Sequence, residues 1–246
     1  MTALRVVGLS HCYGDRVVLD DVSFELAAGE VVAIVGPSGA GKTTLFRSIT
    51  QLVRPDAGRV ELGGRDLTAL SGAELRTARR DIGLVFQQYN LIRRLSALDN
   101  VLAGRLADLP TWRVLTRTPG ASERASALDC LERVGLGHRS SSRADRLSGG
   151  EQQRVAIARA LAQRSRVVLA DEPVSSLDPT SADNVLGALR SIARDDGIAV
   201  LCSLHQVAMV TGFADRVLGL RQGKVVLDLA GADFDEGQRD RVYAAQ

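Results

Sequence analysis

Cysteine is scarce in this sequence, and its distribution excludes two kinds of site. The three cysteines, Cys12, Cys130 and Cys202, are odd in number and far apart, and no two form a C-x-x-C pair. A disulfide framework needs paired cysteines, and a structural zinc site needs closely spaced Cys or His ligands. We therefore expect reduced thiols, as in a cytosolic protein, and no transition-metal site.

Long apolar runs and an excess of one sign of charge are also missing. No apolar stretch approaches the roughly 20 residues needed to cross a bilayer, and the N-terminus shows no signal-peptide pattern. The net charge is +2, which gives no general attraction to nucleic acid. With 246 residues, 45% of them hydrophobic, the sequence predicts a globular α/β protein without a nucleic-acid partner.

A glycine-rich loop is the most informative feature that is present. It follows the apolar run 31–35 and comprises Gly36, Pro37, Ser38, Gly39, Ala40, Gly41, Lys42 and Thr43. Glycines let backbone N–H groups converge on a phosphate, and the start of a helix adds partial positive charge. The pattern predicts a nucleotide-binding loop in which Lys42 reaches the β- and γ-oxygens of a triphosphate and the Thr43 hydroxyl holds Mg²⁺. The helix that follows contributes Thr44 to the expected nucleotide site. Internal repeats are absent, so one site per chain is expected.

The pattern of apolar runs predicts two sheets and a helical insertion. Short β-type runs at 4–9, 17–19 and 22–26 indicate an antiparallel sheet before the loop. Later runs at 82–86, 167–170 and 198–203 alternate with helical stretches, which favours a mainly parallel sheet. We expect a single domain over residues 1–246, with a core of about 1–87 and 152–246 and a helical subdomain of about 88–151.

Two acids, Asp171 and Glu172, end the apolar run 167–170. Successive strand side chains point to opposite faces, so the two carboxylates can take different tasks. Asp171 can hold magnesium directly or through water, and Glu172 can polarise the water that attacks the γ-phosphate. An acidic pair at a strand end is otherwise simply solvated, and the phosphate loop favours the catalytic interpretation.

A short motif after Leu147 indicates which family of nucleotide-binding proteins the chain resembles. Ser148 can cap a helix, and Gly149 and Gly150 leave its N-terminus open to an anion. With the phosphate loop and the acidic strand, this segment resembles the signature motif of ATP-binding-cassette (ABC) ATPases, although Glu151 stands where a glutamine is frequent. The resemblance covers about residues 4–228. It implies the α/β fold of P-loop NTPases of the RecA-like type, with an N-terminal antiparallel β-subdomain and an inserted α-helical subdomain.

The same resemblance implies roles for four further residues. Tyr13 matches the aromatic that stacks on adenine, with a turn tyrosine in a hairpin as the alternative. Gln87 matches the Q-loop glutamine that senses magnesium and the attacking water, with Gln88 as the alternative. Asp178 matches the D-loop residue that communicates across the dimer. His205 matches the switch histidine that contacts the γ-phosphate.

The resemblance also implies the assembly and the cofactors, which are ATP and Mg²⁺. In these ATPases the signature of one chain closes over the nucleotide held by the phosphate loop of another. A head-to-tail homodimer is therefore expected, with Ser148 and Gly150 donating to the γ-phosphate held by Lys42 of the partner subunit. The helical subdomain would transmit the nucleotide state to an integral membrane permease.

Within the family, the segment 86–106, the Trp112-Arg113 pair and the segment 203–207 resemble the ATPase subunit of phosphonate importers. This implies uptake of phosphonates or related phosphorus oxyanions, with a substrate-binding protein as an indirect partner. It places the chain peripherally on the cytoplasmic face of the inner membrane. The alternatives are the ATPase of a lipoprotein- or macrolide-type exporter or of another importer, a non-transport ABC protein, and a metabolic kinase. A kinase would share only the phosphate loop.

Overall fold

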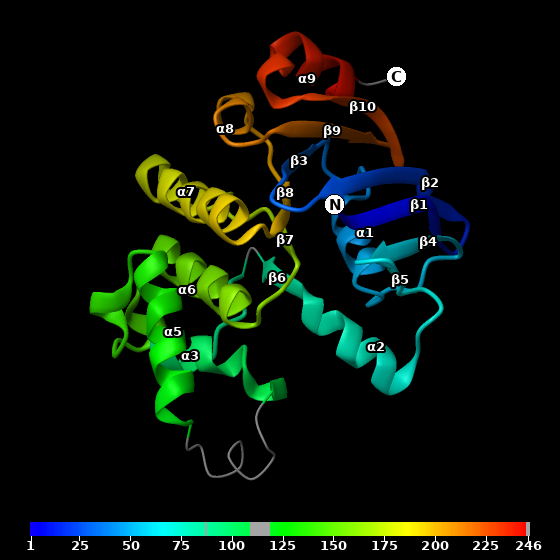
Figure 1. Cartoon of the computed structure of the whole chain (residues 1–246). Helices are drawn as coiled ribbons and strands as arrows, with labels where there is room; N and C mark the ends of the chain where they lie inside the picture. Colours follow the sequence, from blue (N-terminus) through cyan, green and yellow to red (C-terminus); the bar gives the residue numbers. More distant parts are fainter. Residues whose placement is uncertain (87, 109–118, 245–246) are drawn as a thin grey trace.

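The N-terminal part of the chain forms an antiparallel sheet. The computed structural model describes residues 1–86, 88–108 and 119–244, and places the strands of this sheet in the order β2-β1-β4-β5 (Figure 1). These strands are β1 (Thr2–Tyr13), β2 (Arg16–Ala27), β4 (Ala57–Leu62) and β5 (Arg65–Asp66). The β1–β2 hairpin is longer than the predicted runs because backbone pairing continues through polar positions, with register shifts near Gly8, where φ is positive.

A second, six-stranded sheet carries the phosphate loop and the acids. From β9 across the sheet to β6, every pair of neighbouring strands is parallel. The edge strand β10 runs antiparallel to β9. Across the sheet the order is β10 (Lys224–Ala230), β9 (Arg216–Arg221), β3 (Val31–Val35), β8 (Ala199–Ser203), β7 (Val167–Asp171) and β6 (Ile82–Phe86). The strand β8 thus separates the strand before the loop from the strand that ends in the acids.

Alternation of side chains along β3 explains why all five of its residues are apolar and buried. Val31, Ala33 and Val35 face one hydrophobic core, which is closed by α3, α5, α6 and α7. Val32 and Ile34 face a second core, shared with α1 and the N-terminal sheet. Because successive strand residues point to opposite faces, a sheet covered on both sides needs an unbroken apolar run.

Helices cover both faces of the six-stranded sheet (Figure 1). The helices are α1 (Lys42–Ile49), α2 (Gly72–Ala78), α3 (Ala97–Ala103), α5 (Ala121–Arg133), α6 (Gly149–Ala162), α7 (Pro179–Asp196), α8 (Val207–Thr211) and α9 (Glu236–Tyr243). Short 3₁₀ turns are η1 (Arg79–Asp81), η2 (Leu106–Asp108), η3 (Gly137–Arg139), η4 (Ala144–Arg146) and η5 (Gly231–Asp233). Among the described helices, none is long and apolar enough to span a bilayer.

The described residues between β6 and β7 form helices, as their apolar periodicity predicts. Leu98, Val101 and Leu102 are buried on α3, and Leu131 is buried on α5. These helices pack on each other and on α6, which continues past residue 151 to join the core of the sheet. The division of the chain into a core and a helical subdomain stays a prediction.

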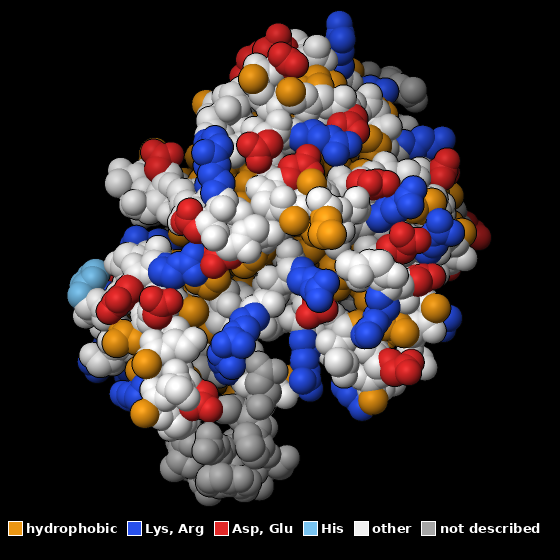
Figure 2. All heavy atoms as spheres, in the orientation of Figure 1, with side chains coloured by type: hydrophobic (Ala, Val, Ile, Leu, Met, Phe, Trp, Pro, Cys, Tyr) orange, Lys and Arg blue, Asp and Glu red, His pale blue; other side chains and the backbone are white. Residues whose placement is uncertain are grey.

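Charges of both signs are mixed on the face of the molecule that Figure 2 draws. Figure 2 shows acidic and basic side chains interspersed on the face drawn there. On this face a notch separates the helical part from the part around α2. The mixed pattern agrees with a net charge of only +2.

Candidate active site

The glycine-rich loop joins β3 to α1, as the sequence predicts. A side chain at Gly36 is excluded, because φ is 158° and a Cβ atom there would lie 2.1 Å from the backbone oxygen of Leu220. Gly41 caps α1 with a φ of 110°, and its Cβ would lie 2.6 Å from the backbone oxygen of Val18. Both glycines therefore allow a backbone path that an L side chain would block.

The side chain of Lys42 lies under this loop. Its Nζ donates hydrogen bonds to the backbone oxygens of Gly36 at 2.7 Å and Pro37 at 3.1 Å. Burial lowers the pKa of Lys42, while the charges of Glu172 and Asp171 oppose the shift. The loop thus wraps around a cationic group that is attracted by the predicted base Glu172 and by the predicted magnesium ligand Asp171.

The acids at the end of β7 contact different partners, and Ser203 at the end of β8 joins them. Asp171 accepts from Thr43 Oγ1 at 3.0 Å and from Ser203 Oγ at 2.9 Å. The backbone N–H of Glu172 donates to Ser203 Oγ at 2.7 Å. Because parallel strands end at one edge of the sheet, residues far apart in the sequence meet here.

Glu172 turns away from Asp171 toward the segment after β8. Its φ is 48°, a left-handed conformation that reverses the chain after the strand. Its Oε1 lies 2.7 Å from His205 Nε2, and both side chains are about one-third exposed, at 29% and 35%. An ionised carboxylate has no proton to give, so the imidazole N–H donates in this contact.

Thr43 and Asp171 suit a magnesium ion. Hydroxyl and carboxylate oxygens are the ligands that Mg²⁺ prefers, and it normally uses one or two protein groups with substrate phosphates and water. Within the described ranges, no group of three or more His, Cys, Asp or Glu could hold a metal by itself. The donor set therefore fits an ion that arrives with a nucleotide.

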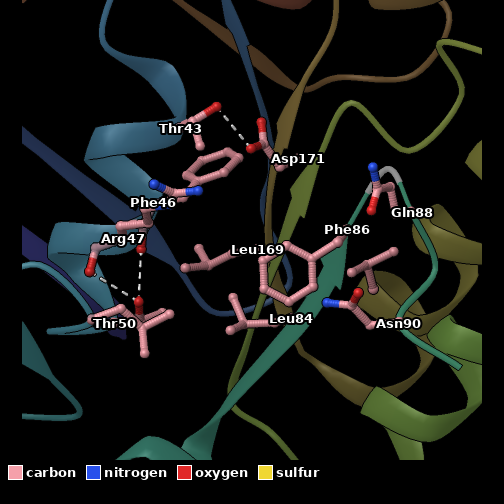
Figure 3. Close-up of a pocket in the computed structure, with 12 residues that line it drawn as sticks. Thr43, Phe46, Arg47, Thr50, Leu84, Phe86, Gln88, Asn90, Leu169 and Asp171 are labelled. Carbon is pink, nitrogen blue, oxygen red and sulfur yellow. Dashed lines mark hydrogen bonds between the residues drawn. The ribbon is translucent and has the colours of Figure 1, made fainter. Parts of the chain in front are cut away.

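A cavity of about 380 Å³ extends from this pair along α1 and β6 (Figure 3). Thr43 and Asp171 lie at one end of it, and Gln88 and Asn90 line the side formed by the segment after β6. Gln87, the predicted Q-loop glutamine, lies outside the described residues, as do Trp112 and Arg113. The side chain of Gln88, its alternative, lines the same cavity as Thr43 and Asp171.

The predicted signature segment begins α6. Ser148 caps this helix, which confirms the predicted capping role: its Oγ accepts from the backbone N–H of Glu151 at 3.3 Å. Glu151 accepts in return from the backbone N–H of Ser148 at 2.8 Å and pairs with Arg139 at 3.1 Å. Partial burial opposes its ionisation, but the hydrogen bonds from Ser148 and Arg139 outweigh it and hold the pKa of Glu151 below its usual value.

Glutamine could also complete the capping box that Glu151 closes, but only the carboxylate of Glu151 can form the ion pair with Arg139. The two signature glycines are tightly packed. A Cβ at Gly149 would lie 2.7 Å from the Tyr89 hydroxyl, and one at Gly150 would lie 2.8 Å from Ser181 Cβ. The hydrogen bonds of Ser148 and Glu151 go to each other and to Arg139, not to the phosphate loop of the same chain.

The other predicted site residues lie at element ends. Tyr13 ends β1 beside the hairpin turn, is 48% exposed, and has its ring edge-on to His11 at a centroid distance of 4.7 Å. Asp178 caps α7 by accepting from the backbone N–H of Ser181 at 3.0 Å. These hydrogen bonds from Ser181 hold the pKa of Asp178 below its usual value.

Two residues near the site were not predicted. Ser203 bridges the acids, and the signal for it is a polar residue that ends a strand next to the acidic one. Tyr243, on the last helix, places its hydroxyl 3.3 Å from the backbone nitrogen of Gly36. Nothing in the local sequence of α9 indicates this contact, because it joins residues 207 positions apart.

Comparison with known proteins defines the class. The family model for ABC transporters matches residues 19–175, which include the phosphate loop, the signature segment and both acids. The chain belongs to the ABC transporter family and is an ATP-binding ATPase of that family. The fold prediction of a P-loop NTPase with an N-terminal antiparallel sheet is confirmed.

Curated proteins similar to this chain are named as subunits of importers. The chain is 49% identical to the phosphonates import ATP-binding protein PhnC of Frankia casuarinae, over 97% of this chain and 94% of that protein. It is 47% identical to the hypophosphite import ATP-binding protein HtxD of Stutzerimonas stutzeri, over 98% of this chain and 70% of that protein. The predicted resemblance to phosphonate-importer ATPases is thus confirmed.

Solved structures of other ABC transporter proteins share the fold. The ATP-binding cassette MJ0796, in a dimeric post-hydrolysis state bound to ADP and Pi, gives a TM-score of 0.81 at 33% identity, covering 94% of this chain and 100% of that one. CbiO1 of Clostridium perfringens, part of the transporter complex cbiONQ, gives 0.84 at 27% identity, covering 98% and 93%.

Proposed function

We propose that this chain drives the import of phosphonates or related phosphorus oxyanions by hydrolysing ATP. The observation that carries the proposal is 42–49% identity, over 97% or more of the chain, to subunits named for phosphonate or hypophosphite import. The exporter alternative draws no support from these names. The transported molecule does not touch this chain, so its identity rests on the relatives.

We propose that the phosphate loop and the ends of β7 and β8 hold the nucleotide. The backbone N–H groups of the loop and the Lys42 ammonium would bind the phosphates, and Tyr13 would stack on adenine. Thr43 and Asp171, with Gln87, would hold Mg²⁺, which when bound neutralises phosphate charge. The oxygens of Thr43 and Asp171 already lie 3.0 Å apart, which supports this assignment.

Glu172 and His205 are proposed to carry the chemistry. Glu172 would accept a proton from the water that attacks the γ-phosphate, and His205 would donate from Nε2 to a γ-phosphate oxygen. Their 2.7 Å contact supports a shared site for both groups. Glu172 is held by its backbone N–H through Ser203, which also fixes Asp171, so the base and the magnesium ligand keep a defined relative position.

The complete site is proposed to form between two chains. The signature segment makes its hydrogen bonds away from its own phosphate loop, and the MJ0796 cassette is dimeric. In a head-to-tail pair, Ser148, Gly149 and Gly150 of one chain would cover the γ-phosphate bound by the other, with Asp178 near the interface. Hydrolysis removes that contact, so the nucleotide biases an open–closed equilibrium.

A membrane permease is the proposed partner that uses this motion. The cavity along α1 and β6 is a suitable place for the permease to bind. It extends from Thr43 and Asp171 to Gln88 and Asn90, in the segment that leads from β6 to the helices. Leu52 lines this cavity and is 57% exposed, so it offers an apolar contact to a partner. The chain would then lie on the cytoplasmic face of the membrane, with a substrate-binding protein acting through the permease.

Uptake of labelled methylphosphonate tests this proposal. In cells whose only copy of the chain is Glu172→Gln, we expect uptake to fall by at least about 100-fold, since the general base is lost. The matched control is Glu74→Gln, a change at an exposed acid on α2, which should leave uptake unchanged. Excess unlabelled hypophosphite and phosphite identify which oxyanion competes. Equal uptake with wild type and Glu172→Gln would assign the chain to another cargo.

A further inference from the structure

The C-terminal helix α9 reaches the candidate active site through one tyrosine. The Tyr243 hydroxyl lies 3.3 Å from the backbone nitrogen of Gly36 and 3.5 Å from His205 Nδ1. These two partners belong to the phosphate loop and to the segment after β8. The tyrosine thus connects the two parts of the site from a third, distant element.

Packing of α9 on the sheet fixes this position. Val242 is fully buried, and a Cβ atom at Gly219 would lie 2.6 Å from its Cγ2. The neighbouring strand β9 therefore has a glycine where the valine of α9 needs room. The guanidinium of Arg239 lies 5.2 Å from the centre of the Tyr243 ring, which holds the ring independently of its hydroxyl.

With a neutral His205 ring, these contacts fit one set of hydrogen bonds. His205 Nε2 donates to the Glu172 carboxylate, so in the neutral ring Nδ1 carries a lone pair. The Tyr243 hydroxyl can donate to that lone pair, while its oxygen accepts from the Gly36 N–H. Burial raises the pKa of Tyr243, so the phenol keeps its proton at neutral pH, although the Gly36 hydrogen bond and Arg239 oppose the shift.

We propose that Tyr243 is a positioning residue that holds His205 in the tautomer with its proton on Nε2. This tautomer is the one that can donate to a γ-phosphate, and the hydroxyl also ties the imidazole to the first residue of the phosphate loop. The 3.5 Å distance is long for a hydrogen bond, and such contacts commonly tighten when substrate binds. The inference rests on the proposed role of His205 in hydrolysis.

Tyr243→Phe removes the hydroxyl and keeps the ring on Arg239. We expect kcat for ATP hydrolysis to fall about two- to tenfold, the effect of one lost hydrogen bond, with KM for ATP changed less than twofold. If Tyr243 only stabilised the fold, the variant would be less stable, but kcat would not fall selectively while KM stayed unchanged. Wild-type kcat in Tyr243→Phe would overturn the proposal.

The tautomer can be read directly, because the chain has only three histidines, His11, His138 and His205. In protein labelled with ¹⁵N at histidine, the His205 signals, assigned with His205→Gln, should show a protonated Nε2 and an unprotonated Nδ1. Tyr243→Phe should shift them toward a mixture of tautomers. Identical His205 signals in both proteins would overturn the proposal even if kcat falls.

The same variants separate this inference from the proposed function. If His205→Gln hydrolyses ATP at the wild-type rate, the role of His205 in hydrolysis is wrong, whatever Tyr243 does. If His205→Gln loses activity while Tyr243→Phe keeps both its kcat and its His205 signals, only the positioning role of Tyr243 is wrong.

Discussion

Lys42→Ala is expected to weaken ATP binding strongly. Its ammonium is the cation at the centre of the phosphate loop, with the carbonyls of Gly36 and Pro37 as its present partners. Charge-assisted hydrogen bonds to phosphate contribute about 1.5–3 kcal/mol each, so losing two of them should raise Kd for ATP by at least about 100-fold. Isothermal titration of purified protein with ATP measures this change.

The matched control for Lys42 is Lys224→Ala. Lys224 lies at the start of β10, where it pairs with Asp20 and its side chain is 61% exposed. An exposed pair of this kind contributes little, so Lys224→Ala should bind ATP like the wild type. Wild-type affinity in a folded Lys42→Ala protein would contradict the assignment of this loop as the phosphate site.

Glu172→Gln is expected to bind ATP and fail to hydrolyse it. The amide keeps the size of the side chain and an oxygen that can accept from His205 Nε2, but it cannot take a proton from water. General-base catalysis contributes about 10²–10⁴-fold, so kcat should fall by on the order of a thousand. With ATP still bound between the chains, the variant should accumulate as a dimer.

Two measurements on purified protein check this expectation. Phosphate release gives the loss of kcat, and gel filtration with and without ATP gives the oligomeric state. Glu74→Gln serves again as the control and should turn over ATP without accumulating a dimer. Turnover of Glu172→Gln at the wild-type rate would remove Glu172 from the catalytic role.

The sequence predicts the parts of the site that phosphate chemistry restricts most. A loop that brings backbone N–H groups to a phosphate needs glycines, and Gly36 and Gly41 have the conformations that require them. Buried parallel strands need unbroken apolar runs, so β3, β6 and β7 were found at nearly their observed bounds. In the N-terminal hairpin, polar residues interrupt the apolar pattern, so the predicted runs were shorter than the observed strands β1 and β2.

Contacts between distant segments could not be predicted in the same way. The approach of Tyr243 to Gly36 depends on how α9 packs on β9, which no local pattern encodes. Two local signals were overlooked: Glu151, three residues after the predicted cap Ser148, completes a capping-box pattern, and Asp178 before Pro179 is a helix start. The signature glutamate and the D-loop aspartate each have a capping role that their family match alone did not show.

The composite site between two chains is tested most directly by mixing two inactive variants. Lys42→Ala removes the phosphate-binding function of the loop, and Ser148→Arg prevents the signature segment from covering the nucleotide of the other chain. One site of a mixed dimer then has both segments intact, so the mixture should recover hydrolysis, up to about a quarter of the wild-type rate with random pairing of equal amounts. Each variant alone should stay inactive. Full activity of Ser148→Arg alone, or no recovery on mixing, would contradict a site shared between two copies of this chain.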